Sequence, residues 1–345
     1  MKNILLIENN KQKLTYYMKR LIWYLILSFI LIVPILLNAL DRKNDTKKAV
    51  LITEPILFDT PEADKILESI EIFPPNNPWN EDISERPVAK DSDKIIEAMD
   101  ANGSLDYNLD MGFVFVPPYQ NKVEIQAEDS KASDEGPFPI PDNAPIEPGS
   151  DRHVIVVDPT NMILYELFAA EKTEWGWQCG SAAKFYLNSN KLRTDWIKYR
   201  DSCGLTSADA AGLPIFPGVV KYGEVMRGEV RHALRVTTRI TRNEYVYPAT
   251  HFASRHSEKK YPRMGERLRL KNNVYIKGYP DDVQAILKAL KKYGMFVADN
   301  GGNWRISVAP DKRFNIKHLN MLRNIKGRNF EVIVPTGPDE GPRAK

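Results

Sequence analysis

Two glutamates five residues apart, Glu224 and Glu229 in GEVMRGEVRH, have the residue type that glycoside hydrolysis requires. That reaction uses two carboxyl groups, about 5 Å apart when configuration is retained and up to about 9.5 Å when it is inverted. A turn between the two glutamates would bring them into this range, one as acid and the other as base or nucleophile. The common alternative is a surface or salt-bridge role, since Glu is frequent beside Arg and Lys.

Two histidines are candidates for proton transfer beside that pair. His232 lies in EVRHALRV, where the period of a strand places it on the face of Leu234 and Val236. A histidine in that position is usually hydrogen-bonded in a core or a cleft wall. His251 follows a proline in YPATHFAS, near an expected strand end, where sites concentrate. A two-His, one-carboxylate metal site would need closer spacing, so we expect no metal and no cofactor.

Four further polar residues are candidates for the same site. Asp209 lies in TSADAAGLPIFPG, a run of small residues that predicts a tight loop, and it is either catalytic or a cap on the loop backbone. Asp299 in ADNGG is a candidate substrate ligand, with a turn role as the alternative. Arg231 and Arg235 alternate with His232 along the expected strand, so they face away from it and could bind an anion.

Aromatic residues and cysteines give weaker indications. Trp175 and Trp177 flank Gly176, and in an extended segment both rings would face one side and could stack on a sugar, although core packing is as common. Cys179 and Cys203 are the two cysteines of the chain. In an oxidising compartment they would form a disulfide closing a loop of about 25 residues, which adds roughly 3 kcal/mol.

Several common catalytic signatures are absent. The sequence has no G-x-S-x-G elbow, no H-E-x-x-H, no Walker loop and no dinucleotide fingerprint. Whether the chain is an enzyme at all therefore stays open at this stage.

The elements that would position these residues are mostly strands. Apolar runs separated by turn clusters begin at RHVIVVD and ILYELFAA and continue through GSAAKFYLNSN, EVRHALRVTTR, NEYVYPATHFAS, GERLRLKNNVYI, YGMFVAD and NWRISVAP. Helical spacing is confined to SDKIIEAMDANG, DDVQAILKALKKYG and NIKHLNMLRNIKG. The pattern predicts a mainly β fold, a jelly-roll-like β-sandwich with two or three peripheral helices.

An uncharged stretch of 20 residues, LIWYLILSFILIVPILLNAL, has the length of a membrane-spanning helix. The basic residues before it favour a cytoplasmic N-terminus and a main domain outside the membrane, as an anchored protein or, after cleavage, as a secreted one. We expect six parts: a cytoplasmic leader (1–20), the anchor or signal segment (21–40), a tether (41–72), an acidic Pro-rich strap (73–150), the β-sandwich domain (151–335) and a disordered tail (336–345).

Charge is divided along the chain. Residues 49–150 carry six Lys/Arg and twenty-two Asp/Glu, whereas residues 151–345 carry thirty-three and twenty. The acidic segment could pack along the basic domain, or the basic surface could bind an anionic polysaccharide. Nucleic acid is not expected as a partner, because no finger or RNA-binding motif is present.

From about Phe73 to Val332 the sequence resembles a family of exported, β-rich proteins of bacteria and fungi. The resemblance is carried by FPPNNPWNEDIS, RHVIVVDPTNMILYEL, TSADAAGLPIFPG, RHALR, YPATHFAS and ALKKYGMFVADNG. It implies a secreted, strand-rich protein and fits a carbohydrate-facing role, without implying a specific reaction. The segment WIKYRDSCGLTSADAAG departs from the family by an insertion before TSADAAG.

Together these observations favour a membrane-tethered, carbohydrate-active protein, with hydrolysis of an envelope or extracellular polysaccharide as the leading hypothesis. The alternatives are a glycan-binding or adhesion module, which would present an aromatic face, and a structural envelope protein without a ligand.

Overall fold

The computed structural model describes residues 51–193 and 203–337, and residues from Val50 onward form one compact unit. The membrane segment expected at 21–40, the leader before it and part of the insertion before TSADAAG lie outside the described residues. Within the described part of the chain, no helix combines the length and the apolar composition needed to cross a bilayer.

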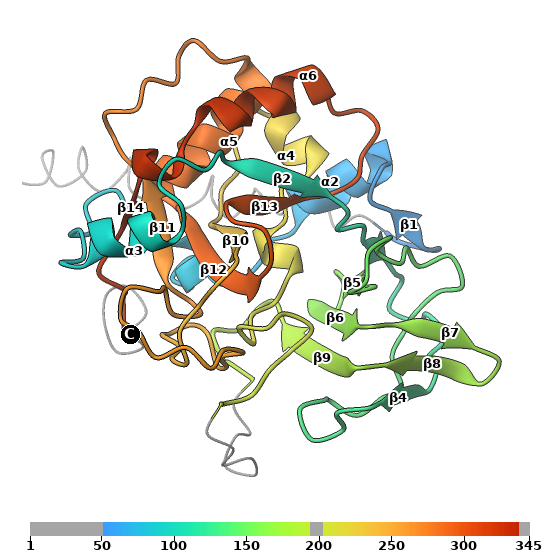
Figure 1. The fold of residues 1–345 in the computed structure, drawn as a ribbon. Helices are drawn as coiled ribbons and strands as arrows, with labels where there is room; N and C mark the ends of the chain where they lie inside the picture. Colours follow the sequence, from blue (N-terminus) through green and yellow to red (C-terminus); the bar gives the residue numbers. More distant parts are fainter. Residues whose placement is uncertain (1–50, 194–202, 338–345) are drawn as a thin grey trace, which may run out of the picture. The chain divides into compact units, whose positions relative to one another are not determined.

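Three sheets carry the fold (Figure 1). The five-stranded sheet has the order β1 (Ile56–Leu57), β3 (Val114–Phe115), β5 (Val154–Asp158), β6 (Ile163–Phe168) and β9 (Ser181–Tyr186). The six-stranded sheet has the order β14 (Phe330–Val332), β11 (Arg267–Leu270), β12 (Met295–Asn300), β10 (Leu234–Thr238), β13 (Arg305–Val308) and β2 (Asp106–Leu109). The three-stranded sheet has the order β4 (Ile125–Ala127), β8 (Gly176–Cys179) and β7 (Glu171–Thr173).

The strand-rich prediction is confirmed, whereas the jelly-roll topology was wrong. Neighbouring strands of a jelly roll run antiparallel. Here β10 pairs with β12, β13 with β2, β3 with β5 and β4 with β8 in parallel. Residues 73–150 are not a separate strap either, because β2, β3 and β4 each enter a different sheet.

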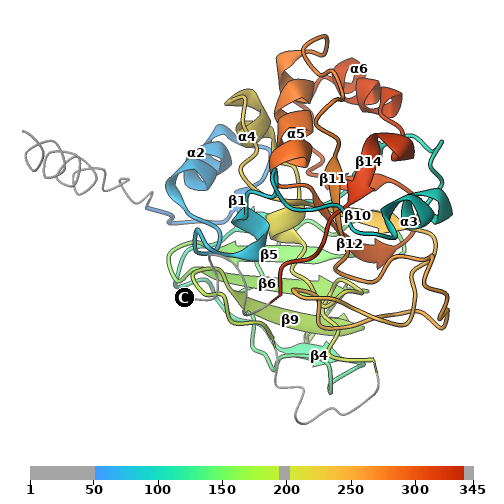
Figure 2. The ribbon, with the colours of Figure 1, turned by 90° about the vertical axis from the view of Figure 1, so that its left-hand side faces the viewer.

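Helices gather on the six-stranded sheet. The described helices are α2 (Pro61–Ser69), α3 (Ser92–Ala98), α4 (Tyr222–Met226), α5 (Asp281–Lys292) and α6 (Ile316–Leu319), with 3-10 turns at Pro78–Asn80, Phe216–Gly218, Asn320–Asn324 and Gly327–Asn329. In both ribbon views α5 and α6 lie on the opposite side of this sheet from β5, β6 and β9 (Figures 1 and 2).

Helix α5 follows directly from its sequence. Two aspartates begin it and two lysines end it, which suits the helix dipole, while Val283, Ile286, Leu287 and Leu290 are buried on one face. Gly294, at a positive φ, lies just beyond the end of the helix.

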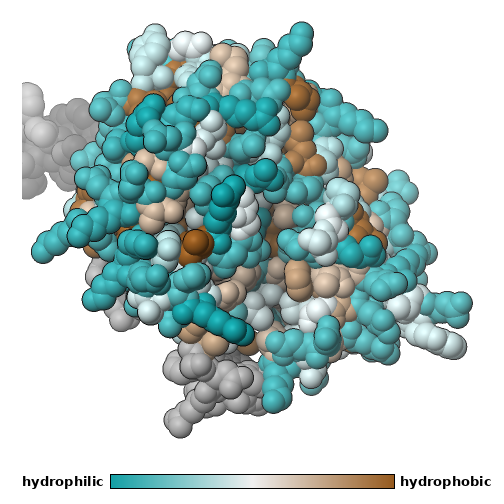
Figure 3. Space-filling view, in the orientation of Figure 1, coloured by the Kyte–Doolittle hydropathy of each residue, from teal (hydrophilic) through white to brown (hydrophobic). Residues whose placement is uncertain are grey.

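Strand β5 explains the unbroken apolar run RHVIVVD. Ile155 and Val157 pack into the main hydrophobic core, while Val154 and Val156 pack into a second core that includes Phe138, Tyr165 and Trp177. Because successive strand residues point to opposite faces, a strand between two cores must be apolar throughout. The surface seen in Figure 3 is mostly hydrophilic, with hydrophobic residues scattered on it.

The Pro-rich segment FPPNNPWNEDIS is held inside the fold by two buried arginines of β11. The Nη1 atom of Arg267 donates to the carbonyl of Pro78 at 2.7 Å, and the Nη1 atom of Arg269 donates to the carbonyls of Ile83 and Ser84. Trp79 in this segment is buried, with its ring centroid 5.0 Å from that of Phe296. The segment therefore has a packing role.

Two expected strands are shorter or missing. Strand β10 begins at Leu234, so His232 precedes it. NEYVYPATHFAS forms no strand and makes only isolated bridges, among them Tyr245 to Met264 and His251 to Gly204. A cis peptide bond joins Tyr247 to Pro248 in this loop.

Candidate functional site

A cavity of about 610 Å³ lies where loops of the two larger sheets meet. Its volume is within the range of small-ligand sites, which is about 300–1,000 Å³. The lining comes from segments far apart in the sequence: Glu128, Asp129, Asp151, Phe168, Gly180, Ser181, Thr206, Ser207, Ala208, Ala210, His251, Ala253, Asp299 and Asn300. Two residues singled out by the sequence, His251 and Asp299, are therefore brought to one cavity.

Asp299 reaches the cavity because of an irregularity in β12. In the parallel pair of β10 and β12, Val236 is opposite Val297 but Thr237 is opposite Asp299, so the register skips one residue. A skip of one residue exchanges the faces of a strand. Asp299 thereby lies on the same face of the sheet as Arg235, with 3.9 Å between Asp299 Oδ2 and Arg235 Nη2.

The carboxyl group of Asp299 has a raised pKa, which suits a proton donor. Its side chain is 21% exposed, and its Oδ1 accepts from the backbone N–H of Asn300. Burial, followed by the negative charge of Asp209, raises the pKa of Asp299 to about 7 against the opposing effect of Arg235. At neutral pH this carboxyl therefore holds a proton for a substantial fraction of the time, as a general acid must.

Asp209 and Arg235 form a buried pair behind Asp299. The Nε and Nη2 atoms of Arg235 donate to the two carboxylate oxygens of Asp209, and its Nη1 donates to Ser307 Oγ at 2.6 Å. Burial alone would lower the pKa of Arg235, but Asp209 and Asp299 raise it above its ordinary value. Arg235 is only 2% exposed, so it acts on Asp299 and not on a ligand. Arg231, in contrast, pairs with Glu229 at the surface.

His251 has the hydrogen-bonding pattern of a general base. Its Nδ1 lies 2.6 Å from the carbonyl oxygen of Ala210, which can only accept, so Nδ1 carries the hydrogen and Nε2 carries the lone pair. Burial lowers the pKa of His251, which favours the neutral ring. Its ring stacks on Phe252 at a centroid distance of 6.3 Å.

The loop that carries Asp209 is fixed from several sides. Glu166 on β6 accepts from the backbone N–H groups of Ile215 and Phe216, and the backbone N–H of Ala211 donates to the carbonyl of Ala298. Burial raises the pKa of Glu166 to about 7, although the two donors favour its charged form. The carboxylate of Asp209 accepts from Arg235 and not from its own loop, so Asp209 is a positioning residue and the expected capping role is not seen. Glu166, which sequence reasoning missed, anchors the loop.

A second residue missed from the sequence, His153, holds the same loop. It is fully buried, with Nε2 2.9 Å from the carbonyl oxygen of Ala208 and Nδ1 2.5 Å from Glu147. Burial opposes protonation, but the Glu147 carboxylate outweighs it and raises the pKa of His153. The imidazolium form therefore donates from both nitrogens. Asp110 lies near this pair, and its Oδ1 is buried without a hydrogen-bond partner among the described residues.

The hydroxyl groups of the lining are engaged in structural hydrogen bonds. Ser207 Oγ lies 2.7 Å from the carbonyl oxygen of Leu213 and accepts from the backbone N–H of Asp209. Ser181 Oγ donates to the carbonyl of Ser207 at 2.9 Å. Because these hydroxyls donate to carbonyl oxygens and contact no base, they lack the pattern of an activated serine nucleophile.

Neither Glu224 nor Glu229 lines this cavity, and the two side chains differ in burial and in their partners. Glu224 is buried in α4, 3.2 Å from His232 Nε2 and 3.8 Å from Lys221 Nζ. Burial would raise the pKa of Glu224, but Lys221 and His232 outweigh it and hold that pKa at about 2. Glu229 is half exposed and pairs with Arg231. Neither glutamate nor His232 lines the cavity, so the structure does not join them with His251.

The two tryptophans do not form a binding face, and that expectation was wrong. Trp175 occupies the turn between β7 and β8 and is 84% exposed, whereas Trp177 is buried in the second core. The expectation assumed an extended segment, but the chain reverses at Glu174 and Trp175.

The disulfide expected between Cys179 and Cys203 is also absent from the structure. Cys179 is buried on β8 in the second core, and burial raises the pKa of its thiol to about 11. Cys203 lies beside the His251 loop, where its carbonyl accepts from the backbone N–H of Phe252. The two residues thus belong to different parts of the fold.

One group of side chains has the donor types of a metal site. Glu147, Asp151 and His153 each offer a ligand atom, all within 4.8 Å of one another. A histidine ligand must present a lone pair to the ion. The Nε2 of His153 faces a carbonyl and its Nδ1 faces Glu147, so neither nitrogen is oriented for a metal. These residues therefore do not fit a resident ion.

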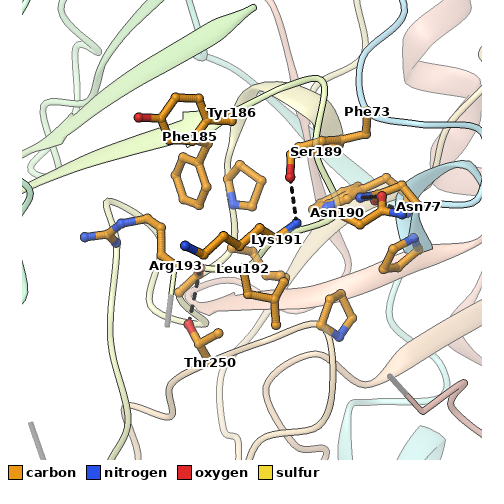
Figure 4. A pocket seen from close by; sticks show the side chains of 16 residues that line it. Phe73, Asn77, Phe185, Tyr186, Ser189, Asn190, Lys191, Leu192, Arg193 and Thr250 are labelled. Atoms are coloured by element: carbon orange, nitrogen blue, oxygen red, sulfur yellow. Dashed lines mark hydrogen bonds between the residues drawn. The ribbon is translucent and has the colours of Figure 1, made fainter. Parts of the chain in front are cut away.

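A second cavity, between the Pro-rich segment and the residues that follow β9, is much smaller (Figure 4). Its volume is about 30 Å³, and Phe73, Asn77, Phe185 and Arg193 are among its lining residues. One water needs at least about 10–15 Å³ by this measure, so the space suits water and not a substrate.

Comparison of the chain with protein-family models, with curated proteins and with solved structures found no match. The geometry of the cavity is therefore the basis for any statement about function.

Proposed function

We propose that the protein is a glycoside hydrolase whose reaction takes place in the 610 Å³ cavity, with Asp299 as general acid and His251 as general base. The observation that carries this proposal is that both side chains line one cavity of ligand size. His251 presents a lone pair because Nδ1 donates to Ala210, and Asp299 retains a proton because of burial and the neighbouring Asp209.

The reaction would proceed by direct attack of water. His251 Nε2 removes a proton from water as the water oxygen attacks the anomeric carbon. The glycosidic C–O bond breaks, and Asp299 gives its proton to the departing oxygen. This uses the acid and base roles of an inverting hydrolase, with an imidazole in place of the second carboxylate. Arg235 and Asp209 do not contact the substrate and set the charge and position of Asp299.

The test is release of reducing ends from envelope and extracellular polysaccharides by the full chain. Asp299→Asn and His251→Gln should each slow release by roughly 10²–10⁴-fold while the circular dichroism spectrum is unchanged. Asp142→Asn and His318→Gln are matched controls, because Asp142 pairs with Lys172 and His318 with Asp282, outside the cavity lining. Wild-type activity in either cavity variant contradicts the assignment. Glycan binding without any release would favour a binding module.

The compartment is a second part of the proposal. The uncharged segment 21–40 would anchor the chain in the cytoplasmic membrane with the cavity outside, or direct secretion if it is cleaved. Protease added to intact cells should degrade the main domain, and full protection would contradict this orientation.

A further inference from the structure

Among the described residues that line the cavity, the charged side chains are all carboxylates, of which Asp299 keeps a proton part of the time at neutral pH. These residues are Glu128, Asp129, Asp151 and Asp299, and none of the described lining residues is a Lys or an Arg. Glu128, Asp129 and Asp151 form no salt bridge with any of the described residues. Within the described part of the chain, the side chain of Asp129 accepts from the backbone N–H of Ala132 and that of Asp151 from Ser150 Oγ.

Three buried cations near the cavity are bound to protein groups. Arg193 donates to the carbonyl of the lining residue Thr206 and pairs with Asp134. Arg235 is buried and holds Asp209 through two hydrogen bonds. His153 is buried, and its two ring nitrogens are hydrogen-bonded to Glu147 and to the carbonyl of Ala208. His153 lies within 4.8 Å of Asp151 as well, but it offers one positive charge to two carboxylates. The cavity therefore keeps a negative potential, which disfavours an anionic polysaccharide and attracts a cation.

The wall of the cavity also includes an aromatic ring. Phe168, at the end of β6, lines the cavity and is 37% exposed, with its ring 5.8 Å from that of His153. An exposed ring in a polar cavity provides a flat apolar surface for the C–H face of a sugar, or for the face of a cation. This feature is independent of the acidic residues and suits a ligand that is both apolar on one face and positively charged.

We infer that the cavity binds a sugar unit carrying a free, protonated amino group, which Asp129 and Glu128 recognise at the rim while Phe168 packs against the ring. This inference rests on the proposed hydrolase function, for which it names the substrate class. An N-acetylated sugar of the same length presents no positive charge and leaves the two carboxylates without a partner.

Calorimetry separates binding from turnover. The probes are hexamers of β-1,4-linked glucosamine and of N-acetylglucosamine, titrated into the full-length Asp299→Asn protein. We expect the glucosamine hexamer to bind about tenfold more tightly, equivalent to about 1.4 kcal/mol, with an affinity that falls as salt is raised. Adding Asp129→Asn or Glu128→Gln should remove this preference, whereas adding Asp142→Asn should retain it.

Each outcome bears on one claim only. Equal affinity for the two hexamers, or a preference that survives both rim substitutions, overturns the amine inference and leaves the hydrolase proposal standing. If the wild-type protein binds the glucosamine hexamer selectively but never shortens it or any other amino-sugar polymer, the amine inference holds and the hydrolase proposal fails.

Discussion

Arg235 donates two parallel hydrogen bonds to Asp209, with 3.1 Å between Nε and Oδ2 and 2.8 Å between Nη2 and Oδ1. Both side chains are almost completely buried. This pair joins the TSADAAG loop to β10, and through β10 it joins the loop to the strand that carries Asp299.

The first prediction concerns this pair. Breaking a buried ion pair by removing one partner leaves an unpaired charge, at a cost of about 3–5 kcal/mol. Arg235→Met and Asp209→Asn should each lower the free energy of unfolding by that amount, measured by urea titration. The double variant should lose less than the sum of the two. Additive losses would show that the two residues act independently.

The second prediction is a pH profile. Because Asp299 must be protonated and its pKa is about 7, turnover should fall as the pH rises through about 7. Because His251 must be neutral and burial lowers its pKa, the acid limb should lie below pH 6.5. Asp299→Asn should reduce kcat by roughly 10²–10⁴-fold. A profile flat from pH 6 to 9 would argue against Asp299 as the acid.

The third prediction concerns the effect of Asp299 on stability at different pH values. The pKa of Asp299 is raised on folding, so the folded chain binds its proton more tightly and stability falls as the pH rises from about 4 to about 7. Asp299→Asn removes this dependence. The variant should therefore be more stable than the wild type at pH 8, and this gain should vanish at pH 4. Thermal unfolding at both pH values measures the difference.

The fourth prediction concerns Glu224. Its pKa of about 2 lies below the unfolded value of 4.5, so its contribution is complete above about pH 4.5 and is lost as the pH falls towards 2. Glu224→Gln should lower the free energy of unfolding at pH 7 by on the order of 3 kcal/mol without changing turnover. Glu229→Gln, at the surface, should cost less than about 1 kcal/mol. Loss of turnover in Glu224→Gln with normal folding would restore it as a catalytic candidate.

The fifth prediction compares two glycines that share a positive φ. A Cβ on Gly212 (φ +71°) would lie 2.1 Å from Thr250 Oγ1, whereas a Cβ on Gly228 (φ +79°) has open space around it. Gly228→Ala should cost only the backbone strain, of order 1–3 kcal/mol. Gly212→Ala should cost more and should also reduce turnover, because it displaces the loop that carries Asp209. Equal losses would show that the contact with Thr250 is unimportant.

The sequence predicted the parts of this fold that depend on local pattern. Helix α5 and strand β5 form where the pattern of apolar residues predicts them, because that pattern reflects which of their residues are buried. The jelly roll could not be excluded from the sequence, because whether β10 lies parallel or antiparallel to β12 depends on contacts between distant segments. The turn at Glu174 and Trp175 was also missed, because a glycine such as Gly176 is compatible with both a turn and an extended segment. In the structure Gly176 has a φ of +136°.

The candidate site was predicted only in part. His251, Asp209 and Asp299 were identified from loop and turn positions, and Arg235 from its place along an expected strand. In the structure His251 and Asp299 line one cavity, and Arg235 and Asp209 lie behind Asp299. His153 and Glu147 were missed because they precede a buried strand with no motif around them. The acid pair was sought at Glu224 because two glutamates were close in sequence, whereas the cavity is assembled from residues more than 100 positions apart.

Four successive residues of strand β5, Val154 to Val157, belong alternately to the two hydrophobic cores. Neither core can lose this strand without exposing the other to water, so the cores have no independent route to unfolding. The amide hydrogens of β5 should therefore exchange with solvent only through global opening, and we expect hydrogen exchange to be slowest in this strand. A site built from strand ends and loops would thus be held in place by a strand that contributes none of its chemistry.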